Sequence, residues 1–186
     1  MSRRAYVVAC HGRYAHFVTT LDLRTLRLRP GEVRKETFDV ELEPFVLGGQ
    51  RYGSTSPTIP VELEISQASG ATVFDLRLRA HLTGACMRCL GFAEAERQVT
   101  AREFYDPDAP VTDDLHSDYV VRDHLQVSAW ARDAVALELP DQILCRPDCA
   151  GLCPVCGKDL NVEPHEHLER DPDPRWAVLE ELKDSL

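Results

Sequence analysis

The sequence predicts an α+β protein, with an antiparallel β-sheet in its N-terminal half and helices after it. Apolar and polar side chains alternate with a period of two between residues 21 and 105, a pattern typical of strands that bury one face. Helical spacing replaces this alternation in the second half. The chain has 186 residues, 44% of them hydrophobic and 28% charged, which suits a globular core and excludes wholesale disorder.

The predicted strands follow one another along the first half. Residues 38–42 and 61–65 place Phe, Val, Leu or Ile at every second position, between acidic residues. After a Ser-Gly turn the same alternation runs from residue 73 to 82, and a weaker one runs from Phe92 to Tyr105. We therefore expect one antiparallel β domain over residues 21–105.

A buried helix is predicted next. Residues 106–118 contain two prolines and five aspartates and predict an acidic surface loop, after which residues 119–121 predict a short strand. Asp123 is a suitable N-cap for a helix from His124 to Leu137, and Pro140 ends it. Most of the circumference of this helix is apolar, so we expect most of it to be buried.

A short terminal helix is predicted to begin at Asp173-Pro174, a capping residue followed by proline in the first turn. It runs through Trp176, Leu179 and Leu182. No apolar run in the chain approaches the roughly 18 residues of a membrane-spanning helix.

Charge is unevenly distributed along the chain, whose formal net charge is −10. Residues 1–35 hold eight Lys and Arg against two acidic residues, residues 36–99 hold five against nine, and residues 100–186 hold eight against twenty. This acidic balance excludes a small basic protein that coats nucleic acid through its overall charge. The basic N-terminal segment is either a solvated arm or a contact for phosphate groups.

Six of the seven cysteines stand in closely spaced pairs. Such spacing without a secretory signal indicates metal binding in a reducing compartment. The apolar stretch before Cys10 has six residues at most, which is too short for the core of a signal peptide. We therefore expect a cytoplasmic protein in which Cys10 has no role and residues 1–20 form a poorly ordered leader. The pairs are Cys86 with Cys89, Cys145 with Cys149, and Cys153 with Cys156.

The last pair has the sequence of a zinc knuckle, Cys153-Pro-Val-Cys156-Gly157, and His165 and His167 follow it closely. Zinc takes four Cys or His ligands, so six cysteines and two histidines suffice for two sites. Only eight residues separate Cys156 from His165, and such a loop closes at little entropic cost. We expect two ligand sets: Cys86, Cys89, Cys145 and Cys149 in one, and Cys153, Cys156, His165 and His167 in the other.

Two alternatives stay open. The pairs at 86/89 and 153/156 could form one ribbon-like site, which would leave the other candidate ligands unbound. The two histidines could also belong to a solvated loop, because Glu163, Glu166 and Glu169 surround them.

Full thiolate-rich coordination leaves no position for a reactive water, so the expected zinc is structural rather than catalytic. The sequence contains no glycine-rich phosphate loop and no nucleophile elbow, and we expect no enzyme. A thiol redox protein is a weaker alternative. The predicted C-terminal part, residues 119–186, is then a helix followed by a zinc-binding segment that packs on the sheet and by the terminal helix.

Six stretches of the sequence together resemble a known family: Leu21–Leu23, Leu28–Glu32, Cys86–Leu90, Leu139-Pro140, Cys145–Asn161 and Asp173–Leu182. On these stretches, over about residues 21–184, the chain is similar to the YceD family, which is named for the accumulation of large-subunit ribosomal RNA. Members with this cysteine-rich segment tend to carry Cys-x-Cys where His165-Glu-His167 stands here, a difference that keeps the number of ligands.

The resemblance implies a role in making or protecting large-subunit (23S-type) rRNA, and therefore in ribosome assembly. Two mechanisms are compatible with it. The protein could be an acidic adaptor or chaperone that holds a basic ribosomal protein until it meets RNA. Alternatively it could contact rRNA directly through its basic residues, of which the candidates are Arg24, Arg27, Arg29, Arg34, Lys35 and Arg88.

Overall fold

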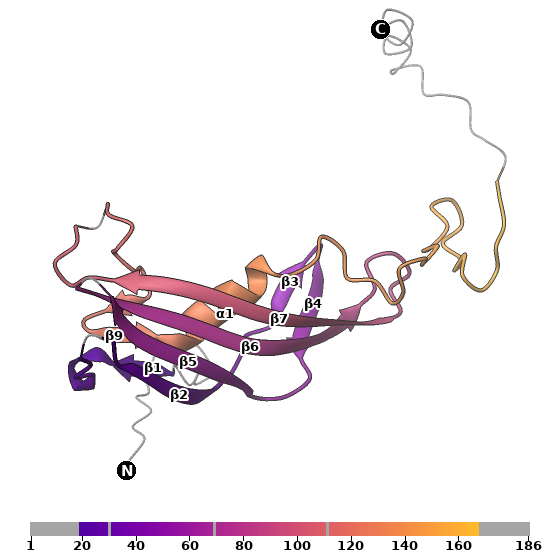
Figure 1. Cartoon of the computed structure of the whole chain (residues 1–186). Helices are drawn as coiled ribbons and strands as arrows, with labels where there is room; N and C mark the ends of the chain where they lie inside the picture. The colour runs from indigo at the N-terminus through magenta and orange to yellow at the C-terminus, as the bar shows by residue number, and fades with distance from the viewer. Residues whose placement is uncertain (1–18, 30, 69, 111, 168–186) are drawn as a thin grey trace, which may run out of the picture.

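The computed structural model describes residues 19–29, 31–68, 70–110 and 112–167 (Figure 1). Most of the predicted leader, including Cys10, lies outside the described residues. The predicted terminal helix from Asp173 also lies outside them.

A six-stranded antiparallel sheet forms the body of the molecule (Figure 1). Its strand order is β2-β5-β6-β4-β3, and β7 pairs with the opposite edge of β6. The antiparallel sheet predicted from the period-two alternation is therefore confirmed. The strands are β2 (Val33–Val40), β3 (Phe45–Leu47), β4 (Gln50–Ser54), β5 (Ile59–Ala68), β6 (Ala71–Ala85) and β7 (Phe92–Tyr105).

A second, three-stranded sheet has the order β1-β9-β8. Its strands, which come from both halves of the chain, are β1 (Thr20–Asp22), β8 (Val120–Val121) and β9 (His124–Gln126). The helical elements among the described residues are the short 3-10 helix η1 (Leu23–Thr25) and the helix α1 (Val127–Leu137). Since α1 has only 11 residues, the described fold is mostly β, and the α+β prediction overstates its helical content. No helix in the described ranges is long and apolar enough to cross a membrane.

The central strand of the large sheet is β6, which pairs with β4, β5 and β7. It pairs with β7 from Thr72, opposite Tyr105, to Ala85, opposite Phe92. On its other edge it pairs first with β5 and then, at Leu82 and Thr83, with β4. This pairing fixes the register of β6, and so it fixes the place where the chain leaves the sheet towards Cys86.

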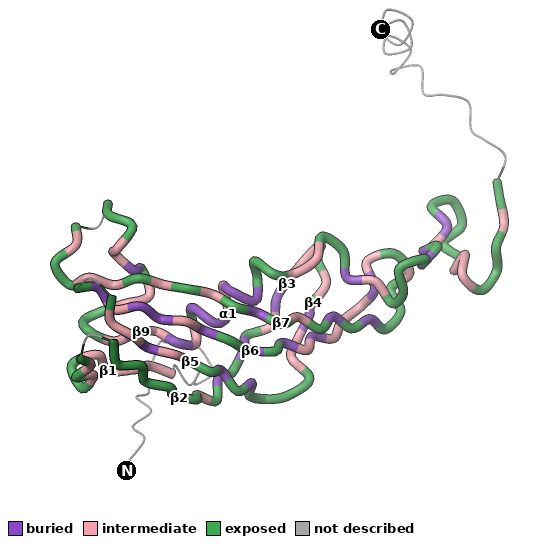
Figure 2. Tube along the Cα trace, viewed as in Figure 1, coloured by how far each residue is buried: buried purple, intermediate pink, exposed green. Residues whose placement is uncertain are grey.

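The hydrophobic core lies between the large sheet and α1 (Figure 2). Alternate residues of β5, such as Val61, Leu63 and Ile65, are fully or almost fully buried, and Trp130 and Ala131 of α1 are buried with them. Burial of such side chains contributes roughly 1.5–3 kcal/mol each. The alternation seen in the sequence therefore marks the core face correctly.

The opposite face of the sheet is covered by ion pairs between neighbouring strands. Lys35 Nζ lies 3.0 Å from Glu64 Oε2, and the guanidinium of Arg102 donates to Asp75 Oδ1 at 2.7 Å. These exposed pairs contribute little stability each, but they leave the charges of this face largely balanced.

The predicted start of the helix is wrong. Asp123 is not an N-cap: with Arg122 it forms the two-residue turn between β8 and β9, and both residues have positive φ (63° and 51°). Residues 124–126 are extended because β9 pairs with β1, so α1 begins only at Val127, and Gln126 makes no side-chain capping bond. The buried stripe of α1 is also narrower than predicted, since Ala129 and Ala136 are exposed.

The hairpin of β3 and β4 is not among the strands predicted from the alternation, although its Gly48-Gly49 turn is a standard hairpin signal. Its main contribution is Tyr52, whose side chain is completely buried. The Tyr52 hydroxyl donates to the carbonyl of Ala85 at 2.7 Å, and the ring lies against Gly84. The hairpin therefore holds the last residues of β6 directly before Cys86.

Candidate functional site

The loop that follows β6 carries the first cysteine pair. The N–H of Cys86 donates to the carbonyl of Gly91 at 2.6 Å, and the N–H of Leu90 donates back to the carbonyl of Cys86 at 3.0 Å. The N–H of Arg88 points at Cys86 Sγ, 3.4 Å away. These bonds form a tight loop that presents the sulfur atoms of Cys86 and Cys89 on one side.

The pair Cys153 and Cys156 has the same loop geometry. The N–H of Cys153 donates to the carbonyl of Lys158 at 2.8 Å, that of Gly157 donates to Cys153 at 2.9 Å, and that of Val155 lies 3.4 Å from Cys153 Sγ. Gly157 adopts a φ of 74° in this loop, and the non-glycine Leu90 adopts 60° at the equivalent place in the first loop. Two knuckles are therefore present, although only the second carries the glycine that identifies it in the sequence.

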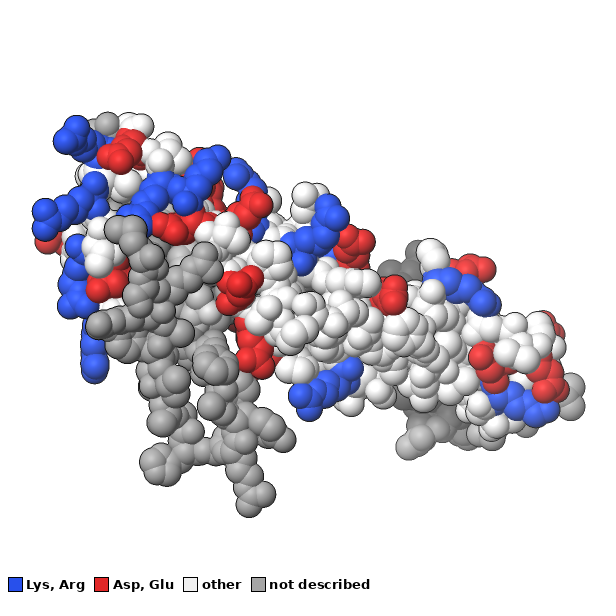
Figure 3. All heavy atoms as spheres, turned by 90° about the horizontal axis from the view of Figure 1, so that it is seen from below, with Lys and Arg blue, Asp and Glu red and all other residues white. Residues whose placement is uncertain are grey.

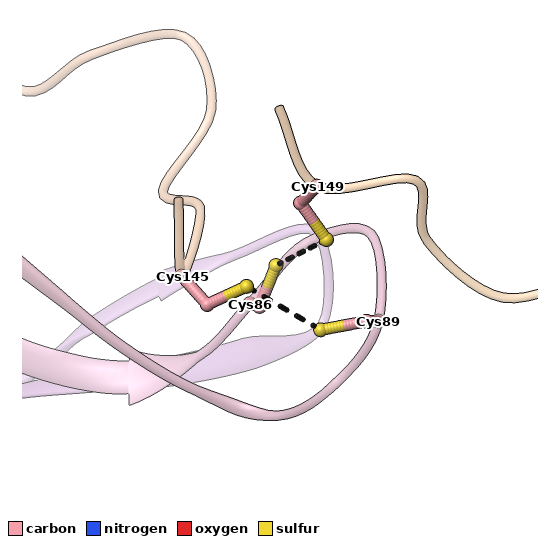
Figure 4. Close-up of side chains that lie close together, drawn as sticks. All are labelled: Cys86, Cys89, Cys145 and Cys149. Carbon is pink, nitrogen blue, oxygen red and sulfur yellow. Dashed lines mark hydrogen bonds between the residues drawn. The ribbon is translucent and has the colours of Figure 1, made fainter. Parts of the chain in front are cut away.

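Four cysteines come together where β6 ends and β7 begins (Figure 4). The sulfur atoms of Cys86, Cys89, Cys145 and Cys149 all lie within 4.8 Å of one another. Cys86 and Cys149 are 3.8 Å apart, and Cys89 and Cys145 are 3.7 Å apart. Sulfur ligands at about 2.3 Å from one tetrahedral ion lie about 3.8 Å from each other, whereas a disulfide needs about 2.05 Å. The spacing fits a four-thiolate metal site and not a disulfide.

The second ligand group is formed by Cys153, Cys156, His165 and His167, whose ligand atoms also lie within 4.8 Å of one another. Nε2 of His165 is 3.1 Å from Cys156 Sγ. Its Nδ1 donates to the carbonyl of Glu163 at 2.7 Å, which raises the pKa of the imidazole and leaves the lone pair of the neutral ring on Nε2. The ring is thus oriented for a metal at Nε2.

In each group, the surroundings of one cysteine favour its ionised form, the thiolate. Burial acts to raise the pKa of Cys86, but the surrounding backbone N–H groups, including that of Arg88, outweigh it and lower the pKa to about 6. The backbone N–H of Cys156, aided by that of Val155, lowers the pKa of Cys153 to about 6. Thiolate is the form of cysteine that binds metals, so both groups have the chemistry of metal sites.

The grouping is the one expected from the sequence, and the two knuckles do not share a site.

Asn161, which lies between Cys156 and His165 in the sequence, contacts the first group. Its amide Nδ2 lies 3.5 Å from Cys149 Sγ, and its Oδ1 accepts from the N–H of Ala150 at 2.8 Å and from Arg146 at 2.6 Å. Asn161 thereby positions the turn that carries Cys149.

Replacement of this residue, Asn161→Ala, should weaken metal retention at the first group by about 10- to 100-fold, the usual effect of losing an outer partner of a ligand. The measurement is the rate of zinc release to a colorimetric chelator. The neighbouring Val162→Ala is the control, because Val162 is 81% exposed and its loss should leave the rate unchanged. Equal rates in both variants would show that Asn161 does not position Cys149.

The candidate RNA-binding residues of the N-terminal segment lie at the other end of the sheet and are exposed. Three of them have acidic neighbours: Arg24 pairs with Asp22 at 3.0 Å, Arg34 with Glu36 at 2.5 Å, and Lys35 with Glu64. Arg24 and Arg27 also line a groove of about 320 Å³, together with Tyr105, Gln67 and Thr72.

Arg88 does not join this set. It lies in the first knuckle, where its guanidinium donates to the carbonyl of Cys149 at 3.0 Å. The structure instead brings the acidic loop over residues 106–118 close to the basic segment, because β7 ends at Tyr105, opposite the start of β6. Basic and acidic side chains are interleaved at this end (Figure 3). Among the described residues, the basic segment is therefore not separated in space from acidic side chains.

Comparisons with known proteins place the chain in a family. Residues 74–183 match the family described as large ribosomal RNA subunit accumulation protein YceD. The uncharacterized protein Rv2926c of Mycobacterium tuberculosis is 33% identical over 169 residues, which cover 88% of this chain and 80% of the relative. The uncharacterized protein ML1660 of Mycobacterium leprae is 32% identical over 129 residues, which cover 67% of this chain and 58% of the relative. No solved structure matches.

The family match spans more than half of the chain, from β6 through both ligand groups. On this evidence the chain belongs to the YceD family.

Proposed function

We propose that this protein is a non-enzymatic ribosome-biogenesis factor of the cytoplasm, which supports the accumulation of large-subunit rRNA and carries structural zinc at its two ligand groups. The observation that carries the proposal is the family match over a segment that includes both groups. The family is described by RNA accumulation and not by a reaction.

Zinc is the metal that the donor sets favour. Four thiolates, or two thiolates with two imidazoles, in a tetrahedral arrangement are typical of structural zinc sites. With four protein ligands bound, the ion has no open position for a water or a substrate. The ion of the first group would connect the end of β6, through Cys86 and Cys89, to the chain after α1, through Cys145 and Cys149.

In this proposal the basic segment over residues 24–35 contacts rRNA directly. Arg24, Arg27 and Arg29 are exposed, and two of them line the groove beside Tyr105, where an unstacked base could lie against the ring. The competing mechanism, an adaptor for a basic ribosomal protein, is favoured by the acidic loop at the same end. A thiol redox protein is the weaker alternative, and stoichiometric zinc without disulfide turnover would exclude it.

The cellular role is tested by depletion of the protein. We expect the ratio of 23S to 16S rRNA to fall, and we expect the wild-type gene to restore it. The variant Cys145→Ser/Cys149→Ser should fail to restore it, whereas Cys10→Ser, at the cysteine outside both groups, should succeed. An unchanged rRNA ratio after depletion would contradict the proposed function.

The mechanism is tested by salt-dependent binding of the purified protein to a large-subunit rRNA fragment. If the basic segment contacts phosphates, the triple variant with Arg24, Arg27 and Arg29 changed to Ala should bind more weakly, and the slope of log K against log salt should fall by about 2–3. The control triple variant changes Arg51, Arg77 and Arg79, which removes the same charge elsewhere. Tight binding of a basic ribosomal protein, with no affinity for RNA, would select the adaptor mechanism instead.

A further inference from the structure

The strand β7 forms one edge of the large sheet (Figure 1). It pairs with β6 on one side, and among the described residues no strand pairs with its other side. Since β7 has 14 residues, from Phe92 to Tyr105, a long row of backbone N–H and C=O groups faces outward along this edge. Such a row is a template for pairing with the strand of another chain, and proteins shorten, charge, cover or pair it.

The side chains on the solvent face of β7 form a row that is complementary to itself. A phenylalanine stands at each end of the row, and Phe92 is 68% and Phe104 41% exposed. Next to these two stand charges of opposite sign, Glu94 and Arg102, and the centre of the row is Gln98. The exposed residues are, in order, Phe92, Glu94, Glu96, Gln98, Thr100, Arg102 and Phe104.

Two copies of this row can face each other in an antiparallel pair of strands. With a two-fold axis at Gln98, each residue lies opposite the residue that is equally far from Gln98 on the other side. Glu94 then faces the partner's Arg102, and Phe92 faces the partner's Phe104. Opposite charges and aromatic side chains directly across two strands stabilise their pairing. The axis produces each of these contacts twice.

Other positions of the axis are less favourable. An axis at Arg97 would place two arginines opposite each other, and an axis at Glu96 would place two glutamates opposite each other, which destabilises a strand pair. An axis at Val99 would place Glu94 opposite the partner's Phe104 and lose the aromatic contact. The axis at Gln98 combines the charged and the aromatic contacts and places no like charges opposite each other.

The core face of β7 is compatible with this pairing. There Ala95 lies opposite the partner's Ala101, and both are small side chains. Arg97 lies opposite the partner's Val99. The Arg97 side chain is held by its own chain, since it donates to the carbonyls of Glu96 at 2.7 Å and Glu138 at 3.1 Å.

The charged residues of the row can keep their neighbours within the chain. Arg102 donates to Asp75 Oδ1 through Nε, at 2.7 Å, and its two Nη groups carry further N–H donors. His81 Nε2 lies 3.5 Å from Oε2 of Glu94, and a carboxylate has a second oxygen that can accept. An ion pair with a partner therefore adds to the contacts of the single chain.

We propose that β7 pairs antiparallel with β7 of a second copy of this chain, with the two-fold axis at Gln98. The large sheets of the two copies then form one continuous sheet. Because the paired strands run in opposite directions, the first knuckle of each copy lies beside the end of the other copy that carries the basic segment. This dimer does not depend on whether the protein binds RNA or a ribosomal protein.

The first test is the mass of the full, zinc-loaded chain by sedimentation equilibrium over a dilution series. The chain has a mass of 20.9 kDa, and we expect a dimer of twice this mass. Glu94→Arg places two like charges opposite each other at both ends of the pair and should weaken association by at least about tenfold.

The control is Asp39→Arg, the same change of charge at an exposed position of β2, at the opposite edge of the sheet. It should leave the association unchanged. Far-UV circular dichroism and zinc content show that both variants are folded. A monomer at every concentration, or equal weakening by the two substitutions, would overturn the proposal.

The register is tested with single cysteines in a Cys10→Ser background. Gln98→Cys should form a disulfide between two copies on mild oxidation with diamide, because residue 98 faces itself. Thr100→Cys alone should not, since the two copies of residue 100 are four residues apart along the strands, about 13 Å. In a mixture it should link to Glu96→Cys. Zinc content checks that the ligand cysteines stay reduced. Equal linking of Thr100→Cys and Gln98→Cys by themselves would overturn the proposal.

Discussion

Removal of zinc with a strong chelator should unfold the chain after α1 and leave much of the large sheet folded. Between residues 143 and 167 the structure contains one isolated bridge, Leu152 with Asp159, and no strand or helix among these described residues. Few side chains there are buried, chiefly Ile143 and the ligands Cys149 and Cys153. If zinc binds as proposed, its coordination supplies most of the stability of this segment, as in zinc fingers, where binding contributes about 10–16 kcal/mol.

Hydrogen exchange measures this result for each part of the chain. After chelation the amides of Cys153 and Leu160 should exchange freely, whereas those of β5 and β6 should keep most of their protection. We expect two zinc ions per chain before chelation, one in Cys156→Ser, and two in Cys10→Ser. A metal-free protein that keeps its protection after residue 143 would contradict a structural role for zinc.

The substitution Gly84→Ala should be strongly destabilising. An added Cβ would overlap the ring of Tyr52 and would lie 2.8 Å from the carbonyl oxygen of Arg51. The ring has no freedom to move away, because Tyr52 is fully buried and its hydroxyl is bonded to Ala85. Overpacking of this kind costs about 3 kcal/mol, and here it separates β4 from β6 next to the first knuckle.

Gly53→Ala is the matched control. Gly53 stands in β4, opposite Thr83, the neighbour of Gly84, and a Cβ there would meet nothing within 4 Å. We expect this variant to change the free energy of unfolding by no more than about 1 kcal/mol. Urea denaturation at saturating zinc measures both variants. Equal stability of the two would show that Tyr52 does not constrain the end of β6.

The sequence predicts the large sheet well because its strands bury one face, and burial imposes the period of two that Val61, Leu63 and Ile65 display. The two ligand groups can also be predicted from the sequence. The close spacing of the cysteine pairs and of His165 favours the two groups over a single ribbon-like site, and the structure brings the same residues together. Whether zinc binds there remains a prediction.

The errors arise where distant segments decide the local structure. Residues 124–126 are extended only because β1 pairs with them, and no local signal near Asp123 reveals that partner. The first knuckle carries a weaker local signal than the second, because Leu90 there takes the left-handed conformation that glycine usually marks. The uneven charge along the sequence is also a poor guide to the distribution of charge in space. Because β7 pairs antiparallel with β6, its last residue lies beside the start of β6, and the acidic loop that follows lies close to the basic segment.

The length of β6 sets the distance over which the two ends of the molecule can influence each other. Its 15 residues span at most about 50 Å, with η1 near its first residue and the first knuckle after its last. The Debye length in physiological salt is only about 8 Å. Charges at one end are therefore screened from the other, and two partners bound at the two ends would be held at a fixed separation without electrostatic communication.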